Sequence, residues 1–182
     1  MNKVPLTLKP QDLFVLLAML AHGGRTRNYL ALIKSTGLAP SVLHGVMKRA
    51  KAAGLMTVDQ ERYYAVLKPQ LKEFVLFGAR YAFPAQMGVL TRGVPTSYAA
   101  APLSSLIAPS ADAVPVWPHV RGEVRGLALS PLHANVPECA MRDEKIYAVL
   151  SLFDAIRAGQ VRERNAAREL LTPYFNTSET PA

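Results

Sequence analysis

Three short helical patterns, each followed by glycine, occupy the first 54 residues of this 182-residue chain and limit what it can fold into. The first covers residues 11–22 and stops at Gly23-Gly24. Its leucines recur at the i, i+3, i+4, i+7 spacing of one apolar helix face: Leu13, Leu16, Leu17 and Leu20. Such a helix must bury one face against neighbouring elements, so we expect a small helical unit here.

Two further helices are predicted directly after the first. We expect Thr26 to cap the second, which stops at Gly37. The third begins at Pro40, a residue tolerated in a first helical turn, and ends before Gly54. Its predicted buried face consists of Leu43, Val46, Met47 and Ala50.

Two short strands are expected after the third helix, near residues 55–58 and 63–66. The connection between them, Asp59-Gln60-Glu61-Arg62, lacks the Asn-Gly or Asp-Gly pair that favours a tight hairpin. The order is therefore helix, helix, short turn, helix and hairpin.

The positive charge of the chain lies entirely in its first part. Residues 1–80 carry 12 basic and four acidic groups, a net charge of +8, whereas residues 81–182 carry nine of each and are neutral. An anionic partner is therefore expected for the first part only, and nucleic acid is the commonest such partner. A surface that is basic merely for solubility remains the alternative.

The segment from Leu38 to Met56 resembles the recognition helix of MarR-like winged-helix transcriptional regulators. It has a Pro-Ser start, aliphatic anchors, a Lys-Arg middle and an Ala-Gly-Leu exit toward a hairpin. The resemblance covers roughly residues 10–66. It implies a winged helix-turn-helix that binds double-stranded DNA as a homodimeric transcriptional regulator, commonly a repressor. Two residues depart from the family pattern, namely Ala39 in place of a capping serine and Gly45 inside the helix.

The resemblance assigns DNA contacts to particular side chains. Ser41 and His44 are candidates for hydrogen bonds to base edges, and Val42 for a thymine methyl contact. Phosphate contacts are expected from Lys48, Arg49 and Lys51 on the helix, and backbone contacts from Arg25 and Arg27 before the second helix. Arg62 in the hairpin turn is expected either to enter a minor groove or to hold a phosphate. The alternatives are an ordinary solvated face, or a winged helix that binds protein instead of DNA.

The second part of the chain is harder to interpret. A helix over residues 69–81 is apolar on most sides, which indicates either a dimer interface or burial within the same chain. Residues 81–121 contain six of the 14 prolines among apolar residues and are expected to form an extended, docked arm with weak strands, such as residues 115–117.

The C-terminal residues are predicted to be mainly helical. We expect a strand at residues 124–129, a short helix opened by Ser130-Pro131, a clear helix ended by Gly159 and a last helix over residues 160–171. The expected fold is α+β, mostly α. It divides into a DNA-binding domain (1–80), a proline-rich arm (81–121), a helical region (122–175) and a disordered tail (176–182).

No catalytic, metal-binding or cofactor motif is evident. The nearest candidates, His119, His133, Glu138 and Cys139, match no zinc spacing, and Cys139 is expected to be buried and structural. The carboxylates Glu138, Asp143, Glu144 and Asp154 are interpreted as surface charge. We therefore expect no enzyme and no cofactor.

The chain has no run of 18 apolar residues and no signal-peptide pattern, and it contains a single cysteine, so a cytoplasmic protein without membrane association is expected. The rival function is a protein-interaction module. An example is an antitoxin-like, autoregulating partner of a neighbouring gene product, bound through residues 84–118 or the C-terminal helices.

Overall fold

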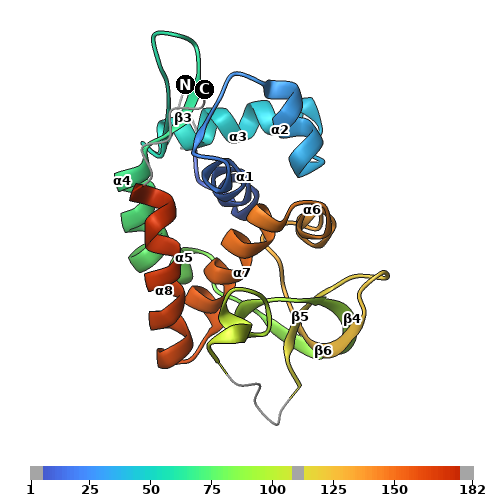
Figure 1. Ribbon diagram of the computed structural model, residues 1–182. Coiled ribbons are helices and arrows are strands. Elements are labelled where there is room, and N and C mark those ends of the chain that lie inside the picture. Colours follow the sequence, from blue (N-terminus) through green and yellow to red (C-terminus); the bar gives the residue numbers. More distant parts are fainter. Residues whose placement is uncertain (1–5, 108–112, 177–182) are drawn as a thin grey trace.

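The computed structural model describes residues 6–107 and 113–176, and it begins with three helices and a three-stranded antiparallel sheet. The helices are α1 (Pro10–Ala21), α2 (Tyr29–Thr36) and α3 (Pro40–Ala52). The strands β1 (Arg25–Thr26), β2 (Met56–Val58) and β3 (Tyr64–Val66) pair in the order β1-β3-β2. Figure 1 shows α1 between α3 on one side and α7 (Glu144–Ala158) on the other.

The three predicted helices and the two hairpin strands are confirmed. Gly37 and Gly54 follow α2 and α3 with φ angles of 65° and 69°, a region that L side chains rarely adopt. The hairpin turn forms without Asn-Gly because Arg62 itself takes a φ of 63° and the Asp59 carboxylate accepts a hydrogen bond from the Tyr63 amide at 2.9 Å. The predicted buried face of α3 is confirmed in full: Leu43, Val46, Met47 and Ala50.

The prediction that Thr26 caps the second helix is wrong. Thr26 lies in β1, opposite Tyr64 of β3, so the chain is still extended there. Asn28 caps α2 instead, and its side-chain oxygen accepts a hydrogen bond from the Ala31 amide at 2.9 Å. Strand β1 escaped prediction because two residues are too few to show a periodic pattern.

Helices α2 and α3 are joined by the three residues Gly37, Leu38 and Ala39, and the chain bends by 107° between the two helices. Tyr29 fixes the start of α3, since its hydroxyl donates to the Pro40 carbonyl at 2.9 Å. No single helix in the described part of the chain is long and apolar enough to cross a membrane, and the one pair of helices with sufficient combined length and apolarity is α2 and α3, with this bend between them.

A helical segment follows the sheet, as predicted, but a π-helical turn interrupts it. It consists of α4 (Lys68–Glu73), the π-helical η1 (Phe74–Gly78) and α5 (Ala79–Ala82). Its inner face packs on α7 (Glu144–Ala158) and α8 (Val161–Asn176) of the same chain, which favours the second of the two expectations for this segment. Phe77 and Tyr81 remain exposed on its outer face.

The expectation of an extended arm over residues 81–121 is wrong. Strands β4 (Met87–Pro95), β5 (Pro115–Pro118) and β6 (Val124–Leu129) close into a small barrel, in which β5 and β6 run parallel. The 3-10 turns η2 (Ser97–Ala99) and η3 (Leu103–Ser105) follow β4, and Pro109 lies outside the described residues. The predicted strands at residues 115–117 and 124–129 are confirmed.

Glycines allow the barrel strands to approach closely. A Cβ on Gly93 would lie 2.2 Å from the Trp117 carbonyl oxygen, and one on Gly126 would lie 2.1 Å from that of Val114. Strand β4 escaped prediction because its sequence contains two glycines and shows no apolar–polar alternation. In the structure its first four residues, Met87 to Leu90, are all exposed.

The C-terminal part is helical, as predicted, with α6 (Val136–Arg142) followed by α7 and α8. The helix expected at Ser130-Pro131 starts later, at Val136. Helix α8 continues to Asn176, so this first residue of the predicted disordered tail is helical, and residues 177–182 lie outside the described residues.

Helix α7 connects the parts of the molecule. It packs on α1, α6, α8 and η2, and its apolar residues belong to the same buried cluster as those of α1 and α3. Residues of the expected DNA-binding domain (1–80) and of the expected helical region (122–175) therefore share one continuous core.

The interpretation of Asp154 as surface charge is wrong. Its side chain is buried and accepts hydrogen bonds from Thr96 at 2.9 Å, Trp117 at 2.6 Å and Arg157 at 2.7 Å. Arg157 also donates to the Ser130 carbonyl. These contacts attach the barrel to α7. A buried carboxylate needs such partners, and residues 58 and 37 positions away along the chain supply two of them.

Candidate nucleic-acid interface

The outer face of α3 carries four of the nine candidate residues. Ser41, His44, Lys48 and Lys51 are exposed, directly opposite the apolar side that packs on α1. Neither lysine forms an ion pair with any residue in the described part of the chain, so both ammonium groups are available to an anion. Val42 is half-buried and packs against the core, with part of its side chain still accessible.

Arg49 does not belong to this outer face. Its guanidinium donates from Nε and Nη2 to the two carboxylate oxygens of Asp12, at 2.7 Å and 2.6 Å. The Asp12 residue is fully buried, and only 14% of the Arg49 side chain is exposed. The hydrogen bond with Asp12 raises the pKa of the guanidinium above its usual range. Arg49 therefore joins α3 to α1, and its guanidinium is occupied by Asp12 instead of being available to a phosphate.

The departure from the family pattern at Gly45 has a structural explanation in Arg49. Arg49 lies one turn after Gly45, and its side chain runs back along the helix toward α1. A Cβ on Gly45 would lie 3.0 Å from Arg49 Nη1. The absence of a side chain at this position therefore leaves room for the guanidinium that pairs with Asp12.

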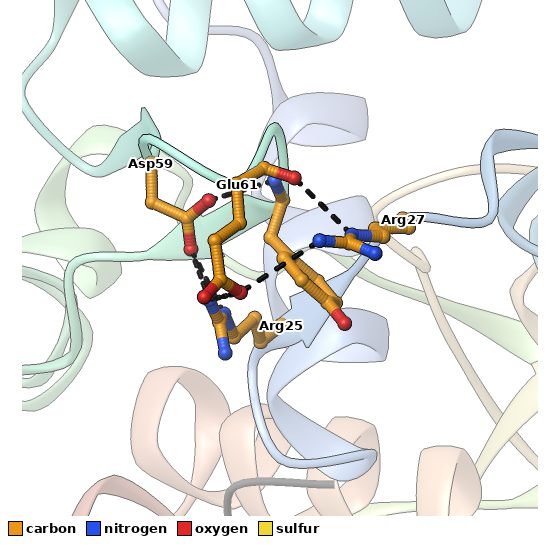
Figure 2. A network of polar contacts seen from close by, with 5 residues as sticks. Arg25, Arg27, Asp59 and Glu61 are labelled. Atoms are coloured by element: carbon orange, nitrogen blue, oxygen red, sulfur yellow. Dashed lines mark hydrogen bonds and ion pairs between the residues drawn. The ribbon is translucent and has the colours of Figure 1, made fainter.

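The hairpin β2–β3 brings a second group of candidates together with two carboxylates (Figure 2). Arg25 donates to Asp59 from Nε at 2.9 Å and also from Nη2. Arg27 donates from Nε to the Glu61 carbonyl at 3.2 Å. Both arginines lie against the ring of Tyr63, with guanidinium carbons 3.9 Å and 4.1 Å from its centroid.

The charges of this cluster stabilise one another. Desolvation raises the pKa of Asp59, but the hydrogen bonds from the Tyr63 amide and the Arg25 side chain outweigh that effect, so the pKa of Asp59 lies below its usual value. The hydrogen bond to Asp59 in turn raises the pKa of Arg25. Asp59 therefore stays ionised and holds Arg25 in place near neutral pH.

Arg62 occupies the turn of the hairpin and is exposed. It has no ion pair with a described residue, so it is the one candidate of the hairpin whose charge no carboxylate of the described part of the chain offsets.

Several residues that shape this surface escaped prediction, namely Asp12, Tyr29, Asp59, Glu61 and Tyr63. Asp12, Asp59 and Glu61 are three of only four acidic residues among the first 80, and each of them meets an arginine. The scarcity of acids in a basic region was the available signal that these three have specific partners.

Two of the residues considered for catalysis or metal binding, His119 and Glu138, belong to an ion-pair cluster. Glu138 meets Arg121, Arg142 and, at 3.4 Å, His119. The hydrogen bond from Arg121 holds the pKa of Glu138 below its usual range. Cys139 is buried, as expected. Among the residues that the structure describes, no three His, Cys, Asp or Glu side chains are arranged to hold a metal ion.

Comparisons of the chain with protein-family models, with curated proteins and with solved structures find no match. Its function is therefore inferred from its own residues.

Proposed function

We propose that the protein is a double-stranded DNA-binding transcriptional regulator in which residues 10–66 act as a winged helix-turn-helix. The observation that carries this proposal is the two-sided character of α3, apolar on the side facing α1 and carrying Ser41, His44, Lys48 and Lys51 on the other. The 107° bend after a three-residue turn is typical of helix-turn-helix units.

In the proposed complex, α3 lies in the major groove. Ser41 and His44, near its start, hydrogen-bond base edges, and the accessible part of Val42 contacts a thymine methyl. Lys48 and Lys51, farther along the same face, neutralise phosphates and fix the register of the helix. The hairpin β2–β3 acts as the wing, and Arg62 at its tip contacts the backbone or the minor groove.

We further propose that the protein acts as a homodimer. The exposed aromatic residues Phe77 and Tyr81, on the outer face of the helical segment after the wing, are the first candidates for the interface. Their replacement by glutamate should yield a monomer in light scattering if this face is used. A wild-type protein that is already monomeric at all concentrations would contradict a dimer.

DNA binding is tested by a salt titration on the duplex upstream of the protein's own gene. The logarithm of the affinity should fall linearly with the logarithm of the salt concentration. Lys48→Ala should lower the affinity and make the slope shallower by about 0.9, the contribution of one phosphate. Lys145→Ala is the matched control, because it removes an exposed lysine on α7, outside the three-helix unit. Absence of binding at low salt would contradict the proposal.

A second candidate function is that of a protein-interaction module. It is favoured by the exposed apolar residues of β4, Met87, Val89 and Leu90, of which Val89 is 80% exposed. The test is co-expression with the neighbouring gene product followed by size analysis. A complex that forms with Val89→Lys as readily as with the wild type would contradict binding through β4.

A further inference from the structure

Two arginines of the hairpin region hold one aromatic ring between them (Figure 2). The arrangement follows from the strand register. Thr26 of β1 lies opposite Tyr64 of β3, so Arg25 and Arg27 project on the same side as Tyr63, which comes one residue before Tyr64. The ring separates two guanidinium groups that would otherwise repel each other, and it keeps both at the surface.

The two carboxylates beside these arginines are attached in different ways. Asp59 is 27% exposed, and it binds both Arg25 and the Tyr63 amide, so it is part of the turn itself. Glu61 is 64% exposed and makes no hydrogen bond to a backbone amide through its carboxylate among the described residues. One Glu61 oxygen, Oε2, lies 3.2 Å from Arg25 Nη2 and 3.7 Å from Arg27 Nη2. Glu61 therefore provides an anion between two cations without being fixed there.

We propose that Arg25 and Arg27 form a binding site for one DNA backbone phosphate, and that the Glu61 carboxylate occupies this site in the free protein. This inference rests on the proposed DNA-binding function. A phosphate presents several charged oxygens to the two guanidinium forks, a geometry that arginine recognises well. Exposed ion pairs such as those of Glu61 contribute little stability, whereas a DNA phosphate brings the additional gain of counterion release.

Asp59 and Glu61 then have opposite effects on binding. Asp59 stays bound to Arg25 in the free and DNA-bound protein and orients its guanidinium, so it is a positioning residue. Glu61 competes with the phosphate and must swing toward solvent. Duplexes that place no phosphate at this point leave Glu61 where it is and gain no affinity from the two arginines.

The test compares the wild type with Glu61→Gln on a mixed-sequence duplex over a range of KCl concentrations. Glutamine keeps the length of the side chain and removes its charge. Affinity should rise about threefold, because one exposed ion pair no longer competes. Glu169→Gln is the matched control, since it removes an exposed carboxylate from α8 with the same change in net charge. Its affinity should change less than that of Glu61→Gln.

Two further variants connect the effect to the site. Arg27→Ala should make the salt slope shallower by about 0.9, and adding Glu61→Gln to it should give a smaller gain in affinity than Glu61→Gln gives in the wild type, because Arg25 alone then holds the site. Asp59→Asn should lower the affinity although it also removes a negative charge. Thermal unfolding of each variant establishes that it is folded.

The outcomes separate this inference from the proposed function. If the wild type binds no duplex at low salt, both fall. If the wild type binds but Glu61→Gln behaves like Glu169→Gln, or the gain in affinity is as large without Arg27 as with it, the phosphate site is wrong while DNA binding stands.

Discussion

Arg49 on α3 donates two hydrogen bonds to the carboxylate of the fully buried Asp12 on α1, at 2.7 Å and 2.6 Å. The next residue toward the start of the helix, Lys48, is exposed and has no ion-pair partner in the described part of the chain. Of these two adjacent basic residues, Arg49 therefore forms an ion pair with a buried carboxylate within the fold, whereas the ammonium group of Lys48 lies at the surface.

Replacement of Arg49 by methionine should destabilise the protein by about 3 kcal/mol, because it leaves a buried carboxylate without its countercharge. Urea unfolding measures the loss. Lys48→Met is the matched control and should change the free energy of unfolding little while it weakens DNA binding. A double variant, Asp12→Leu with Arg49→Met, should recover much of the lost stability. Equal unfolding midpoints for the two single variants would contradict this assignment.

Asp154→Ala should loosen the attachment of the barrel to α7. Three buried donors, on Thr96, Trp117 and Arg157, would lose their acceptor, with an expected cost of about 3–5 kcal/mol. Trp117 is the only tryptophan, so its fluorescence reports this region directly and should shift to longer wavelength.

Thr96→Val provides the comparison for Asp154, because it removes one donor only and should cost about 1 kcal/mol. If Asp154→Ala leaves both the fluorescence maximum and the unfolding midpoint unchanged, the hydrogen bonds of Asp154 do not hold the barrel in place.

His133 should make the protein less stable as the pH falls. Burial holds the pKa of His133 below its usual value, and its ring stacks on Phe14 with centroids 6.0 Å apart. Its Nδ1 accepts a hydrogen bond from the Asn135 amide at 3.1 Å, which requires an unprotonated nitrogen. The folded state thus disfavours the protonated ring, and the stability present above about pH 6.5 is lost as the pH falls through the lowered pKa.

Urea unfolding at about pH 7.5 and about pH 5.5 measures this dependence. His133→Phe retains a ring against Phe14 and cannot titrate, so its stability should fall less between the two pH values. An identical fall in the variant and the wild type would assign the pH dependence to other groups.

Cys139 should resist thiol reagents in the native protein. Burial raises the pKa of its thiol to about 11, so little thiolate is present at neutral pH, and the side chain is not accessible. Ellman's reagent should react slowly with the native protein and quickly in denaturant. Since the chain has one cysteine, the signal belongs to this residue alone. Fast reaction without denaturant would show that α6 opens readily.

Local patterns were sufficient for most of the helices. The stripe of α3 and the glycines after α2 and α3 were predicted because both depend on residues a few positions apart, whose side chains share a helix face or whose backbone needs a positive φ. The same reasoning identified the outward-facing residues Ser41, His44, Lys48 and Lys51, because the residues of α3 that do not lie on its buried face must point to the surface.

Local patterns failed where a partner lies far away along the chain. The helical spacing places Arg49 at the edge of the buried face of α3. Nothing within that helix indicates that it pairs with Asp12, 37 positions earlier in the chain. The prolines and glycines of residues 81–121 suggested irregular structure. The strands of this segment form because they pair with β6 and because the segment packs on α7, and both of these elements lie outside it.

The sequence by itself therefore determined the order of the N-terminal elements, the inner and outer faces of α3 and the side of the molecule that carries its positive charge. Only the tertiary structure decided which charges are available. Arg49 is paired with Asp12, Arg25 is held in position by Asp59, and Asp154 turns inward to Trp117 and Arg157. The physical reason is that helix faces follow from a periodicity of a few residues, whereas an ion pair or a strand pair depends on which distant segments the shared core brings into contact.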